Sequence, residues 1–143
     1  MIGFSKTGNT FTFIDYIISN ISNDIDVIKT NYKDVPSVDL SNYDLIIVGS
    51  STWGDGKIPK NCKEFIVSHA TKYNKKWIVF GTGNSLFVHY CKAVDSIKKI
   101  LEDTGNTVLE TFKYEQRFNL DKLEDHDIIK LRKIKKIIQG ELL

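Results

Sequence analysis

Residues 44–49 read DLIIVG, a continuous apolar run that is followed directly by the polar segment SSTWGDG at residues 50–56. Apolar runs without alternation are typical of strands that are buried on both faces of a sheet. A second run of this kind, WIVFG at residues 77–81, leads into another glycine-containing segment. Two buried strands, each with a polar loop after it, indicate a parallel sheet that carries its functional loops at one edge.

Helical and strand patterns alternate along the rest of the chain. Apolar residues at helical spacing predict helices over residues 10–21, from Pro59 through His69, over 89–103 and over 120–138. Shorter apolar or alternating segments predict the remaining strands, at residues 1–4, 25–29 and 107–114. We therefore predict an α/β fold: a doubly wound, five-stranded parallel sheet in the order 2-1-3-4-5, with helices on both faces, in a single domain over residues 1–143.

Composition narrows the class of protein. The 143 residues are 41% hydrophobic and 27% charged, which is typical of a globular domain rather than a disordered or membrane protein. No apolar run is long enough to span a bilayer, and a net charge of +2 does not by itself indicate nucleic-acid binding. Cys62 and Cys91 form no CxxC motif, so we expect free thiols and a cytoplasmic location. We expect a monomer that binds neither nucleic acid nor membrane.

The predicted topology brings three loops together at the carboxyl ends of the strands: the first loop (residues 5–10), the second loop (50–58) and the third loop (82–90). The first loop is Ser5-Lys6-Thr7-Gly8-Asn9-Thr10. Its hydroxyls, its amide and the N–H groups of the following helix make a pocket for a phosphate, to which Lys6 adds one charge. It is not a Walker A motif, which rules out that route to nucleoside triphosphate hydrolysis. The alternative is a polar turn that only caps the helix.

The second and third loops place aromatic residues beside glycines. In the second loop, Ser51 and Thr52 are positioned to reach the same phosphate, and Trp53 is a large aromatic that could cover a flat heterocycle. In the third loop, Gly83 and Asn84 let backbone groups approach a ligand edge, and the aromatic candidates are Phe87 and Tyr90. The alternative for each aromatic side chain is packing in the core.

Outside the three loops, the polar residues of the sequence indicate no catalytic or metal site. No Ser/His/Asp or Cys/His arrangement is visible, so we predict no catalytic residue. His126 lies among acidic residues without further ligands, so we predict no metal site. Lys and Arg residues at 130–136 alternate with apolar residues and are interpreted as a solvated helix face, with docking to an acidic partner as the alternative.

Three segments together resemble the flavodoxin family. SKTGNT at residues 5–10 is similar to the family's phosphate loop, and NYDLIIVGSSTWGDG at 42–56 is similar to its third strand and first flavin loop. FGTGNSLFVHYCKAVDSIKKILEDTG at 80–105 resembles its second flavin loop and the helix that follows. The three motifs occur in the family's order and cover nearly the whole chain.

This resemblance implies a non-covalently bound flavin mononucleotide (FMN). The phosphate would be held by Ser5, Thr7, Asn9 and Thr10, with help from Ser51, and Thr52 would line the phosphate and ribityl side. Lys6 and Gly8 belong to the same binding loop. Trp53 would stack on one face of the flavin ring and Phe87 on the other, while the backbones of Gly83 and Asn84 would meet its pyrimidine edge. The peptide of Gly54-Asp55 would flip when the flavin is reduced, and Tyr90 and Cys91 would complete the site.

The resemblance implies a carrier that passes low-potential electrons from a flavodoxin reductase to ribonucleotide reductase or another protein acceptor. Asn84 stands where flavodoxins often have aspartate, Phe87 replaces a tyrosine, the first strand is short, and the charge is not acidic. These departures, with FSKTGNT, GTGN, PKNCKEFI and FKYE, resemble the flavodoxin-like activator of class Ib ribonucleotide reductase, which is the first alternative. The others are an NAD(P)H-dependent FMN reductase and an interaction module without cofactor.

Overall fold

The computed structural model describes residues 1–52, 56–86 and 90–140. Its strands are β1 (Ile2–Phe4), β2 (Ile28–Thr30), β3 (Leu45–Ser51), β4 (Lys76–Gly83) and β5 (Thr107–Glu115). Its α-helices are α1 (Asn9–Asn20), α2 (Lys60–Lys72), α3 (Lys92–Asp103) and α4 (Asp125–Ile138), and a short 3₁₀-helix (Leu120–Lys122) precedes α4.

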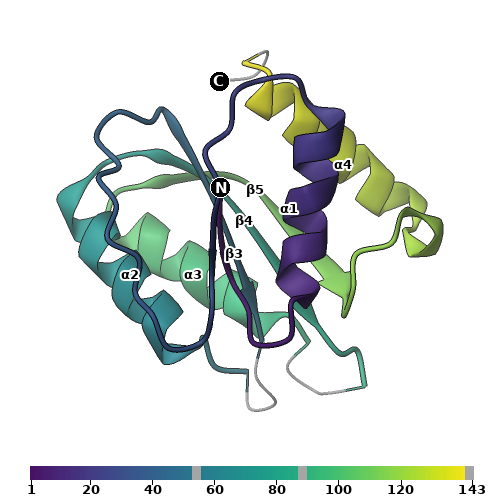
Figure 1. Cartoon of the computed structure of the whole chain (residues 1–143), viewed down its shortest axis with the longest axis horizontal. Helices are drawn as coiled ribbons and strands as arrows, with labels where there is room; N and C mark the ends of the chain where they lie inside the picture. Colours follow the sequence, from purple (N-terminus) through teal and green to yellow (C-terminus); the bar gives the residue numbers. More distant parts are fainter. Residues whose placement is uncertain (53–55, 87–89, 141–143) are drawn as a thin grey trace.

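The strands form one parallel sheet in the order β2-β1-β3-β4-β5, which confirms the predicted topology. Phe4 pairs with Ser50, and Ser51 pairs with Thr82. The carboxyl ends of β1, β3 and β4 therefore reach the same edge of the sheet, the lower edge in Figure 1. The chain runs from β1 outward to β2 and then returns to β3 on the other side, so the strand order reverses between β1 and β3.

Two helix layers cover the sheet, α1 and α4 on one face and α2 and α3 on the other (Figure 1). Beneath α1 and α4 the core contains Phe13, Ile17, Phe80, Phe112 and Ile134. Beneath α2 and α3 it contains Phe65, Trp77, Val79, Ile97 and Leu101. From Leu45 onward the first run is apolar, as is WIVFG, because both faces of β3 and β4 are covered.

Three predicted boundaries were wrong. The last helix does not begin at residue 120: the Asn119 side chain accepts a hydrogen bond from the Asp121 N–H and starts only a 3₁₀ turn. A reciprocal capping box between Glu124 and Asp127 then starts α4. Helix α3 begins at Lys92, after Cys91 in a left-handed conformation, rather than near residue 89. The second strand covers Ile28–Thr30, a little later than predicted.

No helix in the described parts of the chain is long and apolar enough to cross a membrane.

Candidate functional site

The first loop turns into α1 at Gly8. Gly8 has a φ of +89° and is the N-terminal cap of α1, yet no side chain caps that helix. The Ser5 hydroxyl instead accepts a hydrogen bond from the Gly8 N–H at 2.9 Å, and the Ser5 N–H donates to the Thr30 carbonyl at 3.1 Å. In the described parts of the chain, no side chain therefore caps the N-terminus of α1, an arrangement that suits an anion site.

Thr10 gives this loop an unmet hydrogen-bonding group. Its side chain is fully buried in the first turn of α1, and among the described residues its Oγ1 has no hydrogen-bond partner. Two residues later, Thr12 donates to the Asn9 carbonyl at 2.7 Å and accepts from the Phe118 N–H at 3.0 Å. A buried hydroxyl without a partner is destabilising, so a ligand with acceptor oxygens, such as a phosphate, fits the first loop.

The second loop is joined to both of its neighbours. The Thr52 N–H donates to the Thr82 carbonyl at 3.0 Å, and the Thr52 hydroxyl accepts from the Ala93 N–H at 3.1 Å. Thr52 thus links the end of β3 to β4 and to the start of α3. Ser51, the last residue of β3, is half-buried at the same edge. Trp53, Gly54 and Asp55 lie outside the described residues.

The third loop begins in a confined place. A Cβ added to Gly83 would lie 2.9 Å from the Cys91 backbone nitrogen, so a side chain there would displace the start of α3. The Asn84 side chain accepts from the Leu86 N–H at 3.0 Å, which closes a local turn. Phe87, the predicted outer stacking residue, lies outside the described residues.

Tyr90 and Cys91 connect the third loop to α3 and pack toward the core. The Cys91 thiol is fully buried, 3.8 Å from the Gly81 carbonyl oxygen and 3.7 Å from that of Tyr114. Burial raises the pKa of the Cys91 thiol to about 11, so it is protonated and unreactive at neutral pH. The half-buried Tyr90 packs against the core beneath α2 and α3, and burial raises its pKa as well.

The sequence reading missed the residues of β5 that hold the first and third loops. The Tyr114 hydroxyl lies 3.3 Å from the carbonyl oxygens of Asn9 and Thr10. The Ser85 N–H donates to the Glu115 carboxylate at 3.0 and 3.1 Å. Alternation along residues 107–114 identified the strand, but no local pattern indicates which side chains reach loops about 30 and 105 residues away.

Tyr32, just after β2, was also missed. The Lys6 ammonium lies 5.3 Å from the centre of the Tyr32 ring, and the Lys33 ammonium lies 5.4 Å from it. This cation–π contact directs Lys6 toward the end of β2. The two ammonium groups also leave the first loop beside positive charge, which favours an anion.

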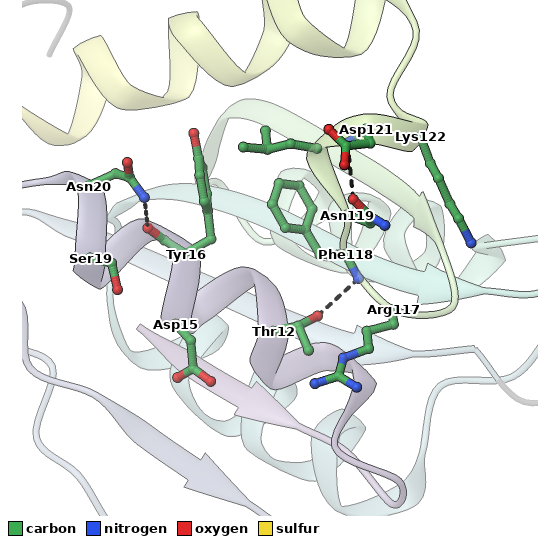
Figure 2. Close-up of a pocket in the computed structure, with 11 residues that line it drawn as sticks. Thr12, Asp15, Tyr16, Ser19, Asn20, Arg117, Phe118, Asn119, Asp121 and Lys122 are labelled. Atoms are coloured by element: carbon green, nitrogen blue, oxygen red, sulfur yellow. Dashed lines mark hydrogen bonds between the residues drawn. The ribbon is translucent and has the colours of Figure 1, made fainter.

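Two hollows lie on either side of the segment that follows β5. Figure 2 shows a groove of about 820 Å³ between α1 and residues 117–122, where the Thr12–Phe118 hydrogen bond joins the two walls. A cavity of about 280 Å³ lies between the third loop, at Ser85 and Tyr90, and the end of β5. Neither is lined by residues 5–10. Within the described residues, no group of three or more His, Cys, Asp or Glu side chains could hold a metal ion.

Comparison with known proteins finds sequence matches over most of the chain. The sequence model of the family described as "Flavodoxin" matches residues 4–129. The chain is 39% identical to a flavodoxin of Maridesulfovibrio salexigens over 112 residues, covering 73% of this chain and 76% of the relative. It is 30% identical to "Probable flavodoxin 2" of Bacillus subtilis over 130 residues, covering 87% and 85%.

The fold agrees as well. The structure of oxidised flavodoxin 1 from Bacillus cereus superposes with a TM-score of 0.70 at 30% identity, covering 99% of this chain and 97% of that one. The family match extends over most of the chain and includes the whole first loop and β3. The chain therefore belongs to the flavodoxin family, whose members bind FMN and transfer electrons.

Proposed function

We propose that this chain passes low-potential electrons from a flavodoxin reductase to a protein acceptor, by means of one FMN held non-covalently between the three loops. The observation that carries the proposal is the buried Thr10 hydroxyl, which has no partner among the described residues and lies in the first turn of a helix that none of their side chains caps. When bound, FMN accepts and releases electrons one or two at a time, and the protein supplies its position and its electrostatic surroundings.

In this proposal the first loop binds the phosphate. Thr10 and the first N–H groups of α1 donate hydrogen bonds to it, and Ser5, Thr7 and Asn9 surround it, with Ser51 and Thr52 closing the β3 side. Gly8 allows the turn, and Lys6 adds positive charge near Tyr32. The dianion is thus bound mainly by neutral donors and a helix N-terminus.

The second and third loops are proposed to bind the flavin ring. Trp53 and Phe87 stack on its faces, and the Gly54-Asp55 peptide changes orientation on reduction. The backbones of Gly83 and Asn84 meet the pyrimidine edge. Tyr90 and Cys91 support the loop indirectly, because the half-buried Tyr90 ring and the buried Cys91 thiol lie next to Gly83 at the start of α3. We place the exchange in the cytoplasm, which the two free, buried thiols Cys62 and Cys91 support.

Electron relay tests this function directly. The purified holoprotein is mixed with NADPH and a flavodoxin reductase under nitrogen, with a one-electron acceptor such as ferric cytochrome c added last. We expect reduction of the bound flavin only when the reductase is present, followed by electron transfer to the acceptor. Rapid oxidation of NADPH by the protein alone would instead identify an FMN reductase.

A second candidate is the activator of class Ib ribonucleotide reductase. The observations that favour it are the neutral Asn84 in the third loop and a net charge of +2, where electron-carrying flavodoxins that dock basic partners are acidic. The test adds the reduced holoprotein and oxygen to a manganese-loaded class Ib reductase subunit. Formation of the tyrosyl radical would select the activator, and its absence would select the general carrier.

A further inference from the structure

The third loop is attached to the end of β5 through one carboxylate. Both oxygens of Glu115 accept a hydrogen bond from the Ser85 N–H, at 3.1 and 3.0 Å, directly after Asn84 in the chain. Glu115 is the last residue of β5 and pairs in register with Gly83 of β4. The Gln116 N–H also donates to the Gly83 carbonyl at 2.7 Å. The sheet therefore fixes the backbone from which this carboxylate extends, and the Ser85 N–H binds its oxygens.

The charge of Glu115 is available to act on the third loop. Its neighbour Lys113 is engaged elsewhere, with its ammonium 2.8 Å from the Asp95 carboxylate. No ion pair joins Glu115 to any other residue in the described ranges. Burial is the main reason why the pKa values of Tyr90 and Cys91 are raised, and the Glu115 carboxylate adds a minor contribution to both.

We propose that Glu115 supplies, from the end of β5, the negative charge that Asn84 does not provide in the third loop, and that it thereby lowers the potential of FMN bound there. This inference rests on the proposed function, since it requires FMN at the three loops. Fully reduced FMN carries more negative charge than oxidised FMN. A fixed carboxylate near the pyrimidine edge therefore weakens binding of the reduced form more than binding of the oxidised form.

Two substitutions separate the charge of Glu115 from its hydrogen bond. E115Q removes the charge and keeps an oxygen that can accept from the Ser85 N–H, whereas E115A removes both. The matched control is E110Q, which removes the same charge from the same strand. Glu110 lies toward α4, where its carboxylate is 3.2 Å from the Lys133 ammonium and 3.7 Å from that of Lys130.

The first measurement is the ratio of the dissociation constants for fully reduced and oxidised FMN, from titration and the midpoint potential. Since Glu115 is exposed, we expect E115Q to lower that ratio by about two- to tenfold relative to wild type, with a smaller effect at high salt. E110Q should leave the ratio within twofold of wild type.

If E115Q binds FMN and shifts the ratio no more than E110Q does, the role of Glu115 is overturned while the proposed function stands. If the wild type binds no FMN, both are overturned.

The second measurement needs no flavin. Hydrogen exchange of the Ser85 amide, followed by NMR in the protein without FMN, reports the bond to Glu115. We expect faster exchange in E115A and near-wild-type exchange in E115Q. Unchanged exchange in E115A would show that Glu115 does not hold the loop, and would overturn the placement on which the inference depends.

Discussion

The hydroxyl group of Tyr114 lies 3.3 Å from the carbonyl oxygen of Asn9, 105 residues earlier in the chain. Tyr114 and Glu115 are consecutive at the end of β5, so their side chains point to opposite faces of the sheet. Tyr114 contacts the first turn of α1, which carries the first loop, and Glu115 contacts the third loop. One strand end therefore braces two of the three loops that the proposed FMN site requires.

Removing the Tyr114 hydroxyl tests this brace. We expect Y114F to lower the free energy of unfolding by about 0.5–1.5 kcal/mol and to weaken FMN binding roughly threefold because the first loop loses support. The control is Y16F, because Tyr16 packs against the same core beneath α1 and α4. Among the described residues, the Tyr16 hydroxyl contacts only the Lys135 ammonium, at 2.6 Å. Chemical denaturation and FMN titration measure both effects; equal loss of FMN affinity in Y16F would contradict the assignment.

Valine at position 10 separates folding from binding. T10V removes a buried hydroxyl that has no partner among the described residues, so we expect the protein without FMN to gain about 1 kcal/mol of stability. The same change should weaken FMN binding about tenfold or more, because a hydrogen bond to a charged phosphate is lost.

The matched control for T10V is T12V. The Thr12 hydroxyl has two partners, the Asn9 carbonyl and the Phe118 N–H, so we expect T12V to cost about 1–3 kcal/mol of stability. Figure 2 shows the bond to Phe118 that this variant removes. Destabilisation of the flavin-free protein by T10V would show that its hydroxyl has a partner in the protein itself.

Alanine at Gly8 tests the conformation of the first loop. Gly8 has a φ of +89°, and apart from its chain neighbours no described residue has an atom within 4 Å of an added Cβ, so G8A should cost about 1 kcal/mol through backbone strain alone. Gly105 is a close match, with a φ of +86° and no nearby atom, but it lies after α3. We expect G105A to be destabilised equally and to bind FMN like wild type, and G8A to bind FMN more weakly. The prediction fails if the two variants bind FMN equally well.

Both thiols should be unreactive in the folded protein. Burial raises the pKa of Cys62 to about 12 and that of Cys91 to about 11, from a usual value near 9. Because only the thiolate reacts, alkylation by iodoacetamide at pH 8 should be slow and should accelerate toward pH 11. The raised pKa values favour the neutral thiol in the folded state, so the contribution of the two thiols to stability should be constant below pH 9 and should be lost as pH rises through about 11 and 12. Rapid labelling of the folded protein at pH 8, at a rate similar to that in urea, would contradict the burial.

Much of the fold followed from local pattern. DLIIVG and WIVFG identified β3 and β4 because a strand covered on both faces must be apolar throughout, and alternation of strands with helices then fixed the parallel topology. The first loop was correctly placed before a helix, and its glycine, hydroxyl and amide residues favour an anion site, which stays a prediction.

The remaining features depend on contacts between distant segments. Pairing of β4 with β5 brings Glu115 to Ser85, and packing of α1 on the sheet brings Tyr114 to Asn9. Neither contact has a local sequence signal. The break before α4 had one, the capping box of Glu124 and Asp127, but the apolar spacing over residues 120–138 concealed it.

The central claim is that the first loop binds the phosphate of a flavin, and comparison of FMN with riboflavin tests it most directly. Flavin fluorescence is titrated with the flavin-free protein, once with FMN and once with riboflavin, which lacks the phosphate. We predict one FMN per chain and binding of riboflavin at least about 100-fold weaker, because the charge-assisted hydrogen bonds of the first loop are then absent. Equal affinity for the two flavins, or binding of neither, would contradict the claim.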